Sequence, residues 1–128
     1  EVIERAINNE DLNIQGLKHT ESKKLIIETF LVEGWAYHPL VFDNMSSYMD
    51  LINKKTLLHI QFGHNAQVYF NILGAASMFN SGLIDVAVFI VPGKSYSYGN
   101  RVNYDKLVLQ YEKFDNFLLV PLLVLEVE

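Results

Sequence analysis

The sequence contains no cysteine and only three prolines in 128 residues. The lack of cysteine excludes disulfide bonds, thiolate zinc sites and a cysteine nucleophile. The longest apolar run, FLLVPLLVLEV at residues 117–127, is too short to span a membrane and is interrupted by Pro121. No Walker A, GxGxxG or GxSxG motif is present, so nothing supports nucleotide binding or serine hydrolase chemistry. No signal-peptide pattern opens the chain, and we expect a cytoplasmic protein without membrane contact.

Basic residues are outnumbered by acidic ones, and the net charge is −5. This sign disfavours nucleic-acid binding over the whole surface, although a local basic rim would be sufficient. The candidates for DNA contacts are Lys54, Lys55, Lys94 and Arg101, with Lys23 and Lys24 as further members of such a rim. Scattered surface charges are the ordinary alternative for all of them.

Half of the residues are hydrophobic, which predicts a folded chain with a substantial core. We expect one domain over residues 1–128, made of a core at 20–128 and a helical segment at 1–19. Apolar spacing predicts helices at 1–9, 20–33, 65–80 and 104–114, the second capped by Thr20 and the third by Asn65. The nearly continuous apolar segments 83–92 and 117–127 predict buried strands, with Pro121 forcing a bulge or an edge position. This order predicts an α/β sandwich on a mixed sheet.

Residues 46–52 and 56–62 read as the two strands of a β-hairpin with its turn centred on Lys54–Lys55. If Asn53 faces Thr56, Asp50 falls directly opposite His59, and Gln61 lies on the same face two residues further on. A slip of one residue would destroy this alignment.

Polar side chains in this arrangement match the needs of metal-assisted phosphodiester hydrolysis. A hard divalent cation needs oxygen ligands, and a further polar group positions water or the scissile phosphate. Asp50, His59 and Gln61 supply such a frame, with an imidazole at the second position. Two alternatives are a simple cross-strand polar pair of Asp50 with His59, and a zinc pair of His59 with His64.

Two sequence blocks carry a family resemblance. MDLINKKTLLHIQFGHNAQVYFNIL, followed by GLIDVAVFIVP, resembles the core of the BglII-like restriction endonucleases within the PD-(D/E)xK nuclease superfamily. The resemblance covers roughly residues 45–125 and is most specific at IQFG and at IDVAVFIVP. It implies a restriction-endonuclease-like sandwich, a central mixed sheet flanked by helices.

The resemblance also implies an activity and a site. The activity is hydrolysis of double-stranded DNA at a specific sequence by a homodimer that uses a divalent metal, normally Mg²⁺. Asp50 matches the metal-binding aspartate of the family, Gln61 matches its glutamine, and His59 stands where the family has a catalytic glutamate. An imidazole brings no negative charge, so such a site should bind Mg²⁺ poorly and accept Mn²⁺ or another transition metal better.

Related nucleases often add an acidic residue from the helix before the hairpin. Glu28 is the first candidate for this additional metal ligand and Glu33 the second, whereas an ion pair of Glu28 with Lys24 is the alternative. Asp85 matches the Ile-Asp pattern of the family, and we expect it to have a structural role. The rival functional hypotheses are a catalytically inactive nuclease fold that binds DNA or protein, and a generic α/β interaction domain.

Overall fold

The computed structural model describes residue 3 and residues 18–37, 40–42, 45–94, 99–114, 116 and 118–127. Its elements in chain order are α2 (His19–Val32), β1 (Ala36–Tyr37), β2 (Leu40–Phe42), β3 (Met45–Tyr48), β4 (Leu51–Asn53), β5 (Thr56–Ile60), α3 (Asn65–Asn80), β6 (Val86–Pro92), α4 (Tyr104–Glu112) and β7 (Leu122–Val127). The helix predicted at 1–9 lies, apart from residue 3, outside the described residues.

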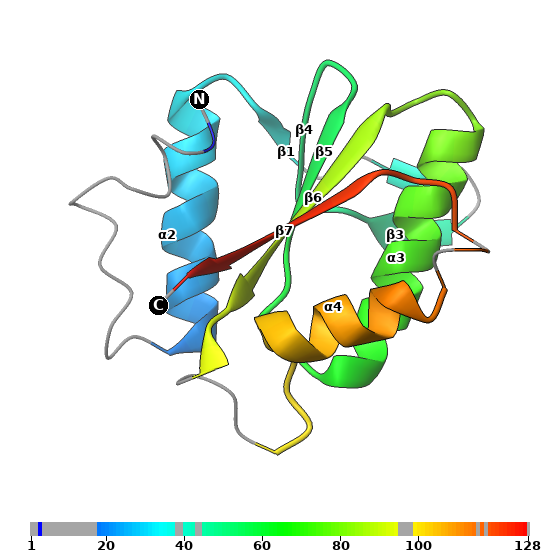
Figure 1. The fold of residues 1–128 in the computed structure, drawn as a ribbon. Helices are drawn as coiled ribbons and strands as arrows, with labels where there is room; N and C mark the ends of the chain where they lie inside the picture. Colours follow the sequence, from blue (N-terminus) through cyan, green and yellow to red (C-terminus); the bar gives the residue numbers. More distant parts are fainter. Residues whose placement is uncertain are drawn as a thin grey trace.

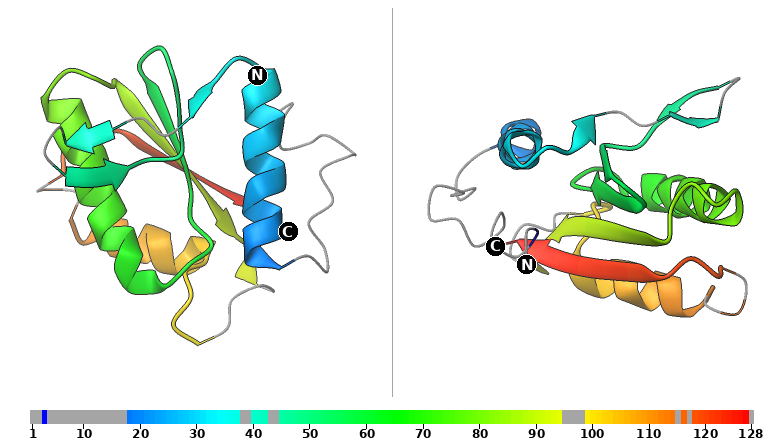
Figure 2. Two further views of the ribbon diagram at one scale, coloured as in Figure 1. Left: turned by 180° about the vertical axis from the view of Figure 1, so that it is seen from behind. Right: turned by 90° about the horizontal axis from the view of Figure 1, so that it is seen from above.

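A five-stranded sheet in the order β1-β4-β5-β6-β7 forms the centre of the molecule (Figure 1). The β1–β4 and β4–β5 pairs are antiparallel, and the β5–β6 and β6–β7 pairs are parallel. The mixed sheet is therefore as predicted. Helix α3 connects β5 to β6, and α4 connects β6 to β7. Both connections are crossovers between parallel strands that move toward the same edge of the sheet. Because such crossovers are right-handed, both helices lie on one face of the sheet. Helix α2 covers the other face (Figure 2).

Strand β6 explains why residues 83–92 are apolar almost without interruption. Its residues Ala87, Phe89 and Val91 join the core cluster that contains α3 and α4. Val88 and Ile90 join the second cluster, which contains α2. A central strand with helices on both faces has no solvent side, so alternation disappears.

The β4–β5 hairpin has the predicted register. Leu51 pairs with Leu58, Ile52 with Leu57 and Asn53 with Thr56. Lys54 adopts a positive φ of 52° in the turn, which allows two residues to connect the strands. Asp50 directly precedes β4 and therefore faces His59.

The predicted strand 46–52 is divided in the structure. Residues 45–48 form β3, which pairs with β2 in a separate two-stranded sheet, and only 51–53 join the main sheet. The Asp50 carboxylate oxygen Oδ2 accepts the Ile60 N–H at 2.7 Å. Because a side chain takes this N–H, the backbone ladder between the two hairpin strands ends there.

Two predicted helix caps were also wrong, and the last predicted strand is less buried than expected. Thr20 lies inside α2, whose N-cap is Lys18, because the Glu21 carboxylate accepts the Lys18 N–H at 2.9 Å. The His64 side chain, not Asn65, caps α3 by accepting the Ala66 N–H. Strand β7 begins after Pro121 and forms an edge of the sheet, which is one of the two positions predicted from this proline, and it is consequently only partly buried.

Candidate functional site

Asp50, His59 and Gln61 lie together at the carboxyl end of β5, and each is at least 95% buried. The imidazole Nδ1 of His59 is 2.8 Å from Asp50 Oδ2, and its Nε2 is 3.0 Å from Gln61 Oε1. Phe89 of the neighbouring strand packs against the imidazole, with ring centroids 5.4 Å apart. The hairpin register and the alternation of side chains therefore bring together the three residues that the sequence singled out.

Asn71 of α3 completes this group, and the sequence analysis did not single it out. Its Nδ2 is 2.7 Å from His59 Nε2 and also donates to Gln61 Oε1. A signal was present, because Asn71 lies in the buried stripe of α3 with Val68 and Ile72. A buried amide in an apolar stripe needs hydrogen-bond partners, and His59 in β5 and Gln61 just after β5 supply them.

Lys23 reaches the same group from α2 on the opposite face. Its Nζ is 2.7 Å from Asp50 Oδ1. From the sequence, Lys23 was predicted only as a member of a basic rim that contacts DNA. The spacing from Lys23 to Ile27 and Phe30 is helical, so Lys23 shares the buried side of α2 with them. We define Lys23, Asp50, His59, Gln61 and Asn71 as the polar cluster.

The Asp50 carboxylate is held in its ionised form. Burial alone would raise the pKa of Asp50, but contacts with His59 and then Lys23 outweigh burial and hold this pKa well below its usual range. Asp50 therefore carries a negative charge at any pH near neutrality.

The two ring nitrogens of His59 face different partners. Asn71 Nδ2 and Gln61 Oε1 both lie within hydrogen-bond distance of Nε2, and Nδ1 faces Asp50. The 2.8 Å contact to Asp50 is close in distance, but Nδ1 forms no hydrogen bond of good angular geometry. We consequently interpret it as an electrostatic contact.

The polar cluster does not fit Mg²⁺. Within the described part of the chain, no group of three or more His, Cys, Asp or Glu side chains is arranged to hold a metal. Asp50 is the single carboxylate of the cluster. Lys23 contacts one of its oxygens, and the Ile60 N–H and His59 approach the other. Mg²⁺ requires several oxygen ligands at short distances, and these oxygens already have partners.

The other predicted ligands lie elsewhere. Glu28 points into solvent, with Oε1 3.7 Å from Lys24 Nζ, which is the ion pair considered as the alternative. His64 accepts the Ala66 N–H through Nδ1, so this nitrogen serves as a helix cap. Asp85 is exposed at the start of β6 and lies 3.7 Å from Lys55 Nζ.

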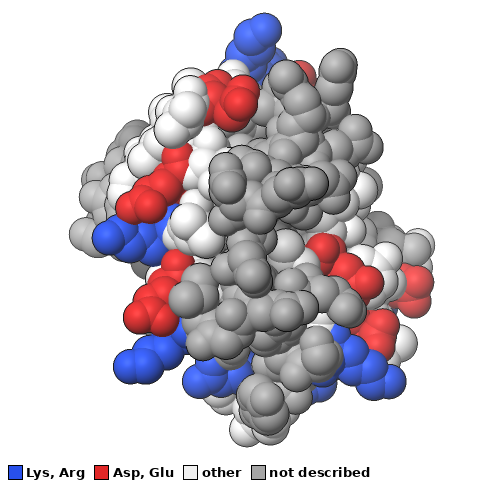
Figure 3. Space-filling model, turned by 90° about the vertical axis from the view of Figure 1, so that its left-hand side faces the viewer, with Lys and Arg blue, Asp and Glu red and all other residues white. Residues whose placement is uncertain are grey.

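The basic residues proposed for DNA contacts occupy two ends of the sheet. Lys54 and Lys55 form the hairpin turn before β5. Lys94 follows β6, and Arg101 pairs with His64 just beyond the carboxyl end of β5. Only Lys94 and Arg101 therefore lie at the same end as the polar cluster. Acidic and basic side chains are interspersed on the side of the molecule that carries α2 (Figure 3).

The family model described as "Restriction endonuclease BglII/BglIII" matches residues 1–126. The chain belongs to this family. Among solved structures, it is similar to the "Crystal structure of restriction endonuclease BglII complexed with DNA 16-mer", with a TM-score of 0.78 and 17% sequence identity. No curated protein sequence matches it significantly.

The structural match covers 87% of this chain and 56% of the BglII chain. The mixed sheet with helices on both faces is thus the restriction-endonuclease fold, as the sequence predicted. This BglII-family chain spans little more than half the length of BglII itself. None of its described helices is both long and apolar enough to cross a membrane.

Proposed function

We propose that this chain is the core of a BglII-family endonuclease that hydrolyses phosphodiester bonds of double-stranded DNA at a specific site. The observation that supports the proposal most strongly is the convergence of Asp50, His59 and Gln61 at the carboxyl end of β5. By the sequence resemblance, Asp50 and Gln61 correspond to functional residues of the family, and His59 stands where the family has a glutamate. Membership of the family implies use of a divalent metal in general terms.

The proposed roles follow from the chemistry of each side chain. Ionised Asp50 would provide the metal ligand, and the Gln61 amide would orient water or a phosphate oxygen. His59 takes the position of a glutamate without its charge. We therefore expect weak or absent cleavage with Mg²⁺ and better support by Mn²⁺ or another transition metal, which accept imidazole ligands more readily.

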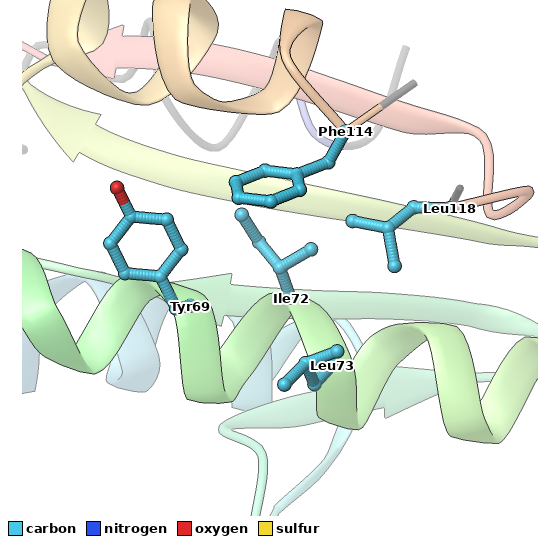
Figure 4. Close-up of a pocket in the computed structure, with 5 residues that line it drawn as sticks. All are labelled: Tyr69, Ile72, Leu73, Phe114 and Leu118. Carbon is cyan, nitrogen blue, oxygen red and sulfur yellow. The ribbon is translucent and has the colours of Figure 1, made fainter. Parts of the chain in front are cut away.

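The proposed partners are double-stranded DNA and a second copy of the chain, in the cytoplasm. The similar BglII structure contains DNA. An apolar groove of about 440 Å³ lies between α3 and the segment that follows α4, lined by Tyr69, Ile72, Leu73, Phe114 and Leu118 (Figure 4). Exposed apolar surface of this kind fits a protein interface, and we assign it to the homodimer.

A second candidate function is DNA binding without catalysis. It is favoured by the engagement of both Asp50 oxygens within a cluster that has only one carboxylate. Such a protein would retain the fold and the DNA-facing surface but would not cleave DNA with any metal.

Plasmid cleavage with Mg²⁺ and with Mn²⁺ tests both functions, comparing the wild type with His59→Glu, Asp50→Ala and Asp85→Ala. We expect His59→Glu to gain Mg²⁺-dependent cleavage, Asp50→Ala to lose all cleavage, and Asp85→Ala to behave as the wild type. DNA binding by gel shift is measured in parallel.

The outcomes separate the hypotheses. No gain in His59→Glu, with fold and DNA binding intact, would reject the assignment of the active site. DNA binding without cleavage in the wild type would establish the second candidate. If Asp50→Ala altered neither metal binding nor DNA binding, a generic interaction domain would remain.

A further inference from the structure

Lys23 covers the one oxygen of Asp50 that the hairpin leaves without a partner. The hairpin engages Oδ2 through the Ile60 N–H and His59, whereas Oδ1 faces the Lys23 ammonium at 2.7 Å. The Asp50 side chain is 6% exposed and that of Lys23 is 35% exposed. The ammonium therefore reaches the buried carboxylate from the solvent side.

We propose that Lys23 is the built-in cation of this site and competes with a divalent metal for Asp50 Oδ1. The proposal rests on the proposed function, because it concerns the same carboxylate. An ammonium and a metal ion at contact distance from one oxygen repel each other strongly. A metal must consequently displace Lys23 before it binds, and Lys23 sets the affinity for metal as a positioning residue.

The charges of the polar cluster explain why a lysine is suitable here. Asp50 is the single carboxylate of the polar cluster, and the Lys23 ammonium at 2.7 Å compensates its charge without any metal. A buried carboxylate without a partner would be strongly destabilising. Two carboxylates facing each other would instead need a divalent ion to balance them. An imidazole in place of a second carboxylate and the ammonium of Lys23 on Asp50 Oδ1 thus both favour the metal-free state.

The helix provides a matched control. Lys23 lies on the buried side of α2, where its aliphatic stem packs along the apolar surface while the ammonium reaches Asp50. The adjacent Lys24 is exposed and pairs with Glu28 at 3.7 Å. Replacing either lysine by glutamine removes one charge from the same helix, but only Lys23→Gln removes it from the polar cluster.

The test is Mn²⁺ binding by the full chain without DNA, measured by calorimetry and by the Mn²⁺ spin-resonance signal. The variants are His59→Glu alone and combined with Lys23→Gln, Lys23→Arg or Lys24→Gln. We expect Lys23→Gln to tighten Mn²⁺ binding by about tenfold or more, because a competing charge is removed. Lys24→Gln and Lys23→Arg should leave the affinity within about twofold of His59→Glu alone.

Two results would overturn the proposal in different ways. Equal Mn²⁺ affinity in the Lys23→Gln and Lys24→Gln combinations would reject the role of Lys23 and leave the proposed function intact. No Mn²⁺ binding in any His59→Glu variant would reject the active site and the role of Lys23 together. If the Lys23→Gln combination does not fold by circular dichroism, Lys23→Gln and Lys24→Gln are compared with Ni²⁺ in the natural His59 background. Tighter Ni²⁺ binding by Lys23→Gln supports the proposal, and equal binding rejects it.

Discussion

Asp50 and His59 face each other across the β4–β5 hairpin, with Nδ1 of the imidazole 2.8 Å from Oδ2 of the carboxylate. By the sequence resemblance, a glutamate is expected at the second position. Two facing carboxylates repel each other unless a cation lies between them, whereas an imidazole in contact with the aspartate does not add a second negative charge. On this proposed correspondence, the protein avoids a repulsion that the family pattern implies.

His59→Glu should destabilise the metal-free protein by about 1–3 kcal/mol, because a buried carboxylate would replace a hydrogen-bonded imidazole. Mn²⁺ should restore part of this stability, since a ligand that binds only the folded state stabilises it. Urea unfolding with and without Mn²⁺ measures both effects. His59→Gln is the neutral control, and it should lose stability without responding to Mn²⁺. An equal response of the two variants to Mn²⁺ would contradict the prediction.

Asn71→Ala should lower the free energy of unfolding by about 1–3 kcal/mol, because it leaves His59 Nε2 and Gln61 Oε1 without their buried donor. The control is Asn80→Ala at the exposed end of the same helix, which we expect to change stability by about 0.5 kcal/mol or less. Denaturant unfolding of both variants provides the comparison. Equal losses would mean that Asn71 is not held by the polar cluster.

The stability of the protein should fall in acid through Asp50. Its pKa is lowered in the folded state, so ionised Asp50 stabilises the fold fully above about pH 4, the region of its unfolded-state pKa. This contribution is lost as the pH falls from there towards the folded-state pKa. The difference in stability between the wild type and Asp50→Asn should be largest near neutral pH and shrink below about pH 4. Asp85→Asn, at an exposed position, should show little difference at any pH, and a constant Asp50→Asn difference would refute the assignment.

Lys54→Gly should stabilise the protein by about 0.5–1 kcal/mol, because Lys54 has a φ of 52° that glycine adopts without steric cost. Lys55→Gly, outside the positive-φ region, should destabilise it. Thermal unfolding of the two variants decides between these directions. Stabilisation by both would indicate relief of charge repulsion in the turn instead of relief of backbone strain.

The groove between α3 and the segment after α4 can be tested through Leu73, which is 54% exposed. If the groove forms the homodimer interface, Leu73→Glu should convert the dimer to a monomer, because it puts a charge into an apolar contact. Leu83→Glu is a control of nearly equal exposure outside the groove. Sedimentation velocity measures the oligomeric state. A dimer that survives Leu73→Glu would exclude this surface.

The hairpin register and the position of β6 could be predicted from sequence because both depend on local patterns. A turn of fixed length sets which residues face each other, and Asp50, His59 and Gln61 follow from it. Lys23 and Asn71 could not be assigned to the cluster in this way. Helical spacing tells which side of α2 or α3 each residue occupies, but not how the helix is rotated and shifted over the sheet.

Strand β4 begins only at Leu51, later than the sequence pattern predicts, and the pattern does not reveal the cause. Residues 46–52 were predicted as one strand, yet the Asp50 side chain accepts the Ile60 N–H, and β3 pairs with β2 instead. Competition of a side chain with the backbone ladder is decided by geometry. The N-cap of α2 has a similar cause. The Glu21 carboxylate accepts the Lys18 N–H, and the cap is therefore Lys18 and not Thr20.

The polar cluster draws its members from α2, the hairpin and α3, and this origin bears on how the chain folds. Asp50 and His59 meet by closing a short loop, whereas Lys23 and Asn71 arrive only when helices dock on opposite faces. Closing the longer loops costs more chain entropy. A folding intermediate that has lost either helix would therefore expose an incompletely neutralised carboxylate or an unpartnered imidazole at its centre. The cluster thus penalises half-assembled states and makes the docking of the two layers a cooperative event.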